Sequence, residues 1–179
     1  RLLSFTPDDV YVLPQLGWTP DSRQVAFQHL NRAQDELELR LLPVPSAPGE
    51  PLGAPRTVLT ERSKTWLNTF GAPRFLKDGR RFLWLSERDG FAHVYLCDVA
   101  GGCRPVTQGP WMVDGRVSFT GAGPGFVLDE RSGFLYFTAT EKDPRERHLY
   151  RVRLHGTGRT RLPGQGGTHR VGVAPAGRF

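Results

Sequence analysis

The hydrophobic and polar positions of the chain follow one pattern three times. Each repeat has an opening run that ends in a polar turn, two longer apolar segments and a short closing segment. The opening runs are residues 16–21, 73–78 and 125–130, the second segments are 23–30, 80–87 and 133–140, the third are 37–44, 92–99 and 148–154, and the closing ones are 56–60, 104–108 and 159–163. Apolar alternation with a period of two is typical of β-strands, so each repeat is predicted to contain four antiparallel strands.

The turns between these segments support the same interpretation. Asp78-Gly79 lies between two predicted strands and indicates a hairpin, because glycine accepts the positive φ that a tight turn needs. Ser132-Gly133 is a weaker copy, and in Asp21-Ser22 a serine replaces the glycine. The charged segments between the second and third strands are expected to form exposed loops: 31–36, 88–91 and 142–147. Residues 33–42 have a composition compatible with a helix, but their place in the repeat predicts a loop followed by a strand.

Four antiparallel strands in each repeat of roughly 45 to 57 residues are typical of the blades of a β-propeller. The predicted fold is therefore all-β: a partial propeller of about three four-stranded blades plus the start of a fourth. We expect residues 1–179 to belong to one propeller domain. The predicted blades are approximately 11–61, 71–109 and 123–163, and residues 169–179 are predicted to be the first strand of the next blade.

The chain begins without Met and stops one strand into a new repeat, so we interpret it as a fragment. Three blades cannot close a ring. At about 25 cal/mol per Å² of apolar surface, the uncovered end faces forfeit on the order of 10 kcal/mol, which is comparable to the stability of a whole domain. We therefore expect either further blades or association with a second copy, a homo-oligomer.

The net charge of +6 comes almost wholly from arginine and raises nucleic acid as a partner. Because the arginines are scattered among acidic residues, as in Glu87-Arg88-Asp89, we expect a solvated surface with local ion pairs and no nucleic-acid partner. No stretch of 18 apolar residues suggests a membrane segment. Residues 1–10 do not resemble a secretory signal, which leaves the compartment open.

Six stretches resemble the N-terminal propeller domain of the dipeptidyl peptidase IV family of serine peptidases, especially its bacterial members. They occur in order at family-like separations: 17–21 (GWTPD), 30–35 (LNRAQD), 75–84 (FLKDGRRFLW), 86–91 (SERDGF), 138–144 (TATEKDP) and 146–150 (ERHLY). The resemblance covers nearly all of the chain. It implies an eight-bladed propeller joined to an α/β-hydrolase domain that removes dipeptides from peptide N-termini, commonly after proline or alanine.

The chain departs from this family where its chemistry is concerned. None of its seven serines lies in a Gly-x-Ser-x-Gly elbow, and we find no match for the family's paired glutamates, which bind the free amino terminus of the substrate. We therefore expect no catalytic residues and no cofactor. The leading hypothesis is a non-catalytic propeller segment that gates and binds peptide substrate, with the missing blades and the hydrolase domain as partners; the fragment alone should be inactive. The alternative is a stand-alone interaction scaffold resembling TolB or WD40 propellers.

The best candidate for substrate contact is the segment 64–70, where the family places a loop near the extended substrate subsites. Trp66, Asn68 and Phe70 would offer aromatic and amide surfaces to a bound peptide. The alternative is that Trp66 and Phe70 pack between blades. This loop is shorter than expected for the family.

Cys97 and Cys103 flank a turn between the third and fourth strands of the second repeat, within reach of a disulfide across a hairpin. In a reducing cytosol they would stay thiols. The resemblance makes a bridge relevant, since relatives in oxidising compartments carry one near this turn. The five histidines have no metal-ligand spacing, so no metal site is predicted, and structural or surface roles are expected for His29, His93, His148, His155 and His169. The charged residues 141–148 are interpreted as a salt-bridged turn.

Overall fold

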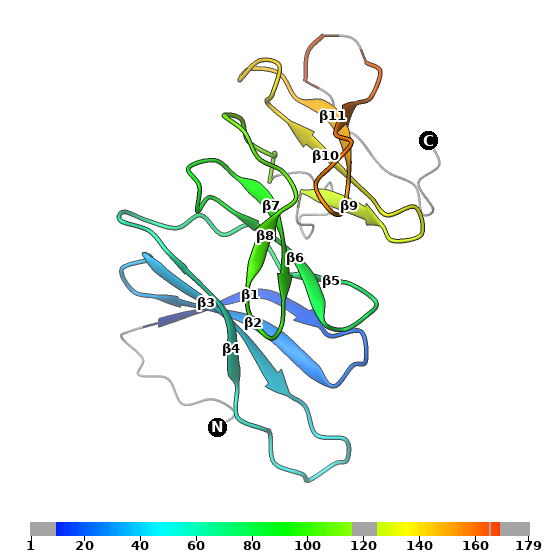
Figure 1. Cartoon of the computed structure of the whole chain (residues 1–179). Coiled ribbons are helices and arrows are strands. Elements are labelled where there is room, and N and C mark those ends of the chain that lie inside the picture. Colours follow the sequence, from blue (N-terminus) through cyan, green and yellow to red (C-terminus); the bar gives the residue numbers. More distant parts are fainter. Residues whose placement is uncertain (1–9, 116–124, 165, 169–179) are drawn as a thin grey trace. The chain divides into compact units, whose positions relative to one another are not determined.

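The computed structural model describes residues 10–115, 125–164 and 166–168, and these residues form strands and no helix (Figure 1). Twelve strands make three four-stranded sheets, with the orders β1-β2-β3-β4, β5-β6-β7-β8 and β12-β11-β10-β9. The prediction of three four-stranded antiparallel sheets is confirmed. The predicted first strand of a fourth blade, residues 169–179, lies outside the described residues.

The strands agree with the sequence pattern to within a few residues at most ends. They are β1 (Val10–Trp18), β2 (Gln24–Asn31), β3 (Glu36–Pro43), β4 (Arg56–Arg62), β5 (Arg74–Phe75), β6 (Arg81–Ser86), β7 (His93–Asp98), β8 (Cys103–Pro105), β9 (Phe126–Asp129), β10 (Phe134–Ala139), β11 (His148–Arg153) and β12 (Thr160–Arg161). The helix-compatible stretch 33–42 is a turn followed by β3, because cross-strand pairing with β2 and β4 outweighs a weak helical propensity.

The described residues belong to two compact units. The first unit is formed within residues 1–83 and 97–102, and the second within residues 84–96 and 103–179. The first contains the whole β1–β4 sheet, and the second contains the whole β9–β12 sheet. Strands β6 and β7 contribute residues to both.

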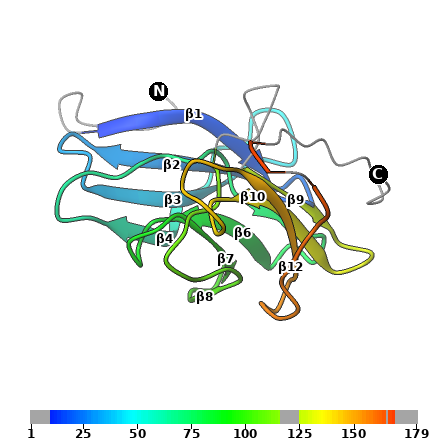
Figure 2. The same ribbon diagram turned by 90° about the horizontal axis from the view of Figure 1, so that it is seen from above.

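The β1–β4 sheet buries one of its faces, and Figure 2 shows its strands side by side in sequence order. Burial alternates along β3: Leu37, Leu39 and Leu41 are at most 2% exposed. The residues between these leucines point to the opposite face and are more exposed. On that face Glu38 forms an ion pair with Arg40. This alternation follows from the strand geometry, in which successive side chains point to opposite faces.

The core of the second unit is organised around Trp111, which is 5% exposed. Its ring stacks on Phe137 and Tyr150, with centroid distances of 6.0 and 6.4 Å. The imidazole of His93 meets it edge-on at 4.7 Å. These aromatic contacts join the segment after β8 to β10 and β11, so they connect elements that are distant in sequence.

Residues 112–114, which lie between the second and third predicted blades, extend the third sheet. Val113 forms an antiparallel bridge with Ala139, and the backbone N–H of Asp114 donates to the carbonyl of Thr138 at 2.9 Å. Gly125, just before β9, approaches the same segment closely. A Cβ there would lie 2.6 Å from the Asp114 carbonyl oxygen, and its φ of +75° also favours glycine.

The turn between the first and second strands of each sheet contains a residue in the left-handed conformation. These residues are Ser22, Gly79 and Gly133, with φ values of 58°, 67° and 69°. The glycines adopt this conformation without steric cost, whereas Ser22 adopts it with a side chain. The backbone therefore follows the same course even where the sequence replaces glycine.

An aspartate in each of these turns accepts backbone hydrogen bonds. Asp21 accepts from the N–H of Arg23 at 3.1 Å, and Asp78 accepts from the N–H groups of Arg80 and Arg81 at 2.9 Å each. Asp129 plays the corresponding role in the third sheet. Such side-chain acceptors fix the turn by replacing hydrogen bonds to water.

These hydrogen bonds lower the pKa of all three carboxyls. A hydrogen bond from Thr19 lowers the pKa of Asp21, and one from Ser132 lowers the pKa of Asp129. Partial burial of Asp78 acts in the opposite direction, but the donors of the following arginines together outweigh it and lower its pKa. The charged form of each aspartate is therefore favoured in the folded state.

Both cysteines are disulfide-bonded in the structure, Cys97 at the end of β7 and Cys103 at the start of β8. The turn between them is tight: the N–H of Asp98 donates to the carbonyl of Gly102 at 3.0 Å.

Among the described residues, no helix has the length and apolar character that crossing a bilayer requires.

We expect Gly79→Ser to lower the free energy of unfolding by about 1 kcal/mol, because serine is disfavoured at this positive φ. Urea unfolding followed by circular dichroism measures the change. Ala100→Ser, in a turn residue without positive φ, serves as the control and should be nearly neutral. Equal midpoints for the two variants would contradict the assignment of strain to the turn.

We expect stability to fall as the pH decreases from about 4 toward 2. A carboxyl whose folded pKa lies below its unfolded value stabilises the fold above the unfolded pKa, and protonation removes this contribution through the folded pKa. Urea midpoints measured across this range should decline. The decline should be shallower in the triple variant D21N/D78N/D129N, in which asparagine keeps the acceptor but loses the charge. Parallel pH profiles for wild type and variant would refute this assignment.

We expect reduction of the Cys97–Cys103 bridge to lower the free energy of unfolding by about 2 kcal/mol, because a short closed loop restricts the unfolded chain modestly. Urea midpoints with and without dithiothreitol measure the effect. The double variant C97S/C103S should not respond to the reductant. A wild-type midpoint that the reductant leaves unchanged would show that the bridge does not form in solution.

Candidate functional site

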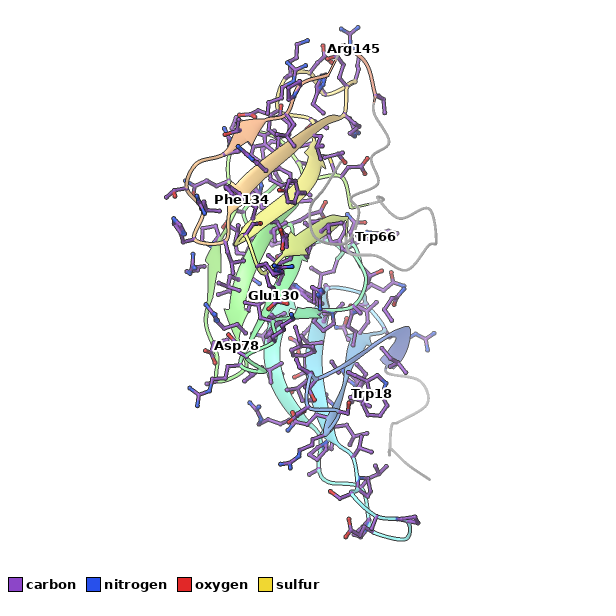
Figure 3. All side chains as sticks on the ribbon, turned by 90° about the vertical axis from the view of Figure 1, so that its right-hand side faces the viewer. Trp18, Trp66, Asp78, Glu130, Phe134 and Arg145 are labelled. Carbon is purple, nitrogen blue, oxygen red and sulfur yellow. The ribbon has the colours of Figure 1, made fainter. Side chains whose placement is uncertain are left out.

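The loop between β4 and β5, residues 63–73, contains all three residues predicted to contact a peptide. It lies in the first unit, and the side chain of Trp66 extends from it (Figure 3). Apart from a bend at residues 64 and 65, the loop has no regular structure. Functional residues are often carried by such loops when a rigid scaffold positions them.

Trp66 is 63% exposed, the largest exposure among the large hydrophobic side chains described. Its indole Nε1–H donates to Oδ1 of Asn68 at 3.2 Å, so the structure brings these two predicted residues together. The side chain of Asn68 is also exposed, and Phe70 is half-buried. Most of the Trp66 side chain is therefore exposed to solvent in the described part of the chain.

Three hydrogen bonds anchor the β4–β5 loop to β2 and to the turn that follows it. The N–H of Ser63 donates to the carbonyl of Asp35 at 2.9 Å, and the N–H of Leu67 donates to the carbonyl of Gln34 at 2.8 Å. At the other end, Nε2 of Gln28 donates to the carbonyl of Gly71 at 2.8 Å. Both ends of the segment that carries Trp66, Asn68 and Phe70 are thus held.

The β2–β3 turn that accepts two of these bonds is itself ordered by side chains. Nδ2 of Asn31 donates to Oδ1 of Asp35 at 2.7 Å, and Oδ1 of Asn31 accepts from the N–H groups of Asp35 and Glu36 at 3.1 Å each. Gln34 adopts a φ of 59°, a conformation uncommon for residues other than glycine. The β2–β3 turn therefore orients the carbonyls of Gln34 and Asp35 that accept hydrogen bonds from the loop.

Sequence reasoning missed these supporting residues. One indication was present: Gln28 is a polar residue inside an apolar strand, and such residues are buried only with a hydrogen-bond partner. Its partner lies 43 positions away, and the sequence does not show that separation.

The side chains of this loop carry groups that are suited to binding. An exposed indole, an amide and a half-buried phenyl ring offer an apolar surface with one hydrogen-bonding group, and none of them is a nucleophile. Across the described ranges, no cluster of three or more His, Cys, Asp and Glu side chains is placed to hold a metal ion. Cys97 and Cys103 lie outside this loop and are engaged in their disulfide.

The charged residues 141–148 form the salt-bridged turn that the sequence predicted. Arg145 pairs with Asp143 at 3.0 Å, and its hydrogen bonds lower the pKa of that carboxyl to about 2. His148 is 1% exposed, and its Nε2 lies 2.6 Å from a carboxylate oxygen of Glu146. The hydrogen bond from His148 lowers the pKa of Glu146. These pairs order the loop between β10 and β11.

Comparison with known proteins relates the chain to one family. The family model described as "Dipeptidyl peptidase IV (DPP IV) N-terminal region" matches residues 2–179. A probable dipeptidyl peptidase 4 of Emericella nidulans is 29% identical over 161 residues, which are 83% of this chain and 19% of that protein. Its counterpart from Aspergillus flavus is 28% identical and covers 79% of this chain and 18% of its own length.

The crystal structure of Porphyromonas gingivalis dipeptidyl peptidase 4 is similar, with a TM-score of 0.70 and 26% identity over 89% of this chain and 20% of that chain. The chain spans about a fifth of the length of these relatives. Its three four-stranded sheets are the blades of a partial β-propeller. The chain belongs to the dipeptidyl peptidase IV family and forms part of its N-terminal region.

Proposed function

We propose that this chain is a non-catalytic propeller segment of a serine dipeptidyl-peptidase and serves as a wall that gates and binds peptide substrates. In this role the β4–β5 loop contacts the peptide, while a hydrolase domain of the same protein removes the N-terminal dipeptide. The propeller admits flexible peptides and excludes folded proteins. Its contribution is binding energy and exclusion, and bond cleavage occurs elsewhere.

The exposure of Trp66 is the observation that carries this proposal. Most of its indole is accessible to solvent although the ring could bury a large apolar area, and tryptophan is among the residues that dominate binding energy at interfaces. The hydrogen bond to Asn68 occupies the indole N–H and leaves the ring faces as the contact surface. Flat aromatic surfaces suit the pre-ordered rings of proline-containing peptides, the substrate class that the family suggests.

The absence of a nucleophile elbow supports assigning cleavage to another part of the protein. No serine in the sequence has glycine two residues away on both sides. The partners proposed are therefore a peptide and the hydrolase domain.

The proposal predicts that Trp66→Ala weakens binding of a proline-containing peptide about tenfold or more, because truncation of an exposed aromatic contact typically costs 1–2 kcal/mol or more. Isothermal titration calorimetry with Ala-Pro-Ala-Ala-Ala measures the affinity. Trp18→Ala is the matched control: Trp18 is 57% exposed on β1, outside the loop, and its removal should leave the affinity unchanged.

An equal loss of peptide affinity in the two tryptophan variants would contradict the assignment of binding to this loop. The same preparation should leave an Ala-Pro anilide uncleaved, and turnover that persists through purification would contradict the non-catalytic role. Binding of a folded protein partner in place of short peptides would instead favour a stand-alone interaction scaffold.

A further inference from the structure

We infer that Gln28 is a positioning residue that holds the β4–β5 loop in a preset conformation, so that its aromatic side chains meet a peptide without prior rearrangement. This inference rests on the proposed function, since it concerns how the same loop binds. It adds a residue of β2, outside the loop, to those that determine peptide affinity.

The side chain of Gln28 is fully buried, with 0% of its surface exposed. It projects from the same face of β2 as Ala26 and Leu30, both buried, so the position is one where an apolar side chain would pack. Its Nε2 donates to the Gly71 carbonyl at 2.8 Å, while its Oε1 has no hydrogen-bond partner among the described residues. A buried amide with one unsatisfied oxygen is costly, so core packing alone does not account for glutamine here.

The atom that Gln28 contacts, the carbonyl oxygen of Gly71, lies at the C-terminal end of the loop, next to Phe70. Gly71 follows Phe70 directly and has a φ of 104°, a conformation that residues with a side chain rarely adopt. The hydrogen bond from Gln28 fixes the orientation of the peptide group that follows Gly71. The course of the chain directly after Phe70 is therefore held by the conformation of this glycine and by the buried amide.

The other end of the segment is held independently of Gln28. The N–H groups of Ser63 and Leu67 donate to the carbonyls of Asp35 and Gln34, which Asn31 orders through its side chain. Between Leu67 and Gly71 the loop carries Asn68 and the half-buried Phe70, and Trp66 directly precedes Leu67. A loop tied at both ends loses less conformational entropy when it binds a ligand than a loop tied at one end.

This arrangement predicts that one substitution at position 28 can lower peptide affinity while it leaves the stability of the fold almost unchanged. Replacing Gln28 by methionine keeps the length and volume of the side chain, removes the bond to Gly71 and also removes the unsatisfied oxygen. The change should leave the fold nearly as stable as before and release one end of the loop. Peptide affinity should fall because the released loop must be ordered again during binding.

The test compares Gln28→Met with Leu30→Met, which changes a buried residue on the same face of β2 without removing a hydrogen bond. Hydrogen–deuterium exchange of residues 63–71 reports the order of the loop. Calorimetry with Ala-Pro-Ala-Ala-Ala reports the affinity and the entropy of binding. In Gln28→Met we expect exchange in this segment to rise about three- to tenfold and the Kd to rise by a similar factor, with a more unfavourable binding entropy. Leu30→Met should change none of these quantities.

Gly71→Ala provides a second variant that disturbs the same end of the loop from outside the core, in case Gln28→Met does not fold. It should also raise exchange and the Kd. Unchanged exchange in a folded Gln28→Met protein, or raised exchange with an unchanged Kd, overturns the inference. If wild type binds no peptide while Gln28→Met still loosens the loop, the proposed function fails and the structural role of Gln28 stands.

Discussion

The register of the antiparallel hairpins is the constraint on which the rest of this structure depends. Side chains alternate between the two faces of a strand, so a slip of one residue in the β2–β3 hairpin would move the buried leucines of β3 to the exposed face. The turns between first and second strands secure the register of the hairpins that they close, each with one left-handed residue and one aspartate that accepts backbone N–H groups. In the β2–β3 turn, the side chain of Asn31 has the corresponding role. Turns of this kind allow few alternative pairings.

The geometry of the candidate binding loop depends on this register. Gln28 pairs with Leu39 across the β2–β3 hairpin, and Leu39 pairs with Leu59 of β4. The same pairing that buries the leucines therefore places the amide of Gln28 on the buried face, where it reaches Gly71. The backbone of the loop is irregular, but its conformation is defined because it is hydrogen-bonded to β2 and to the β2–β3 turn.

The proposed binding surface is consistent with the proposed division of roles between this segment and a hydrolase domain. The groups on the loop supply contact area and one hydrogen-bonding amide, and cleavage needs a nucleophile, a base and an oxyanion site that these groups cannot provide. Charged residues elsewhere, as in the turn 141–148, are engaged with one another and order loops between strands. The arginine-rich composition is thus compatible with local ion pairing and does not require a polyanionic partner.

The sequence by itself determined the strands, the turns, the number of sheets and the family, because apolar alternation and turn residues act over a few positions and the family motifs are contiguous. The tertiary structure alone decided which polar residue supports the loop, how far Trp66 is exposed and that residues 112–114 extend the third sheet. These features depend on contacts between distant positions, such as Gln28 with Gly71 and Val113 with Ala139. No local pattern encodes such contacts, since they form only after the sheets have brought separate segments of the chain together.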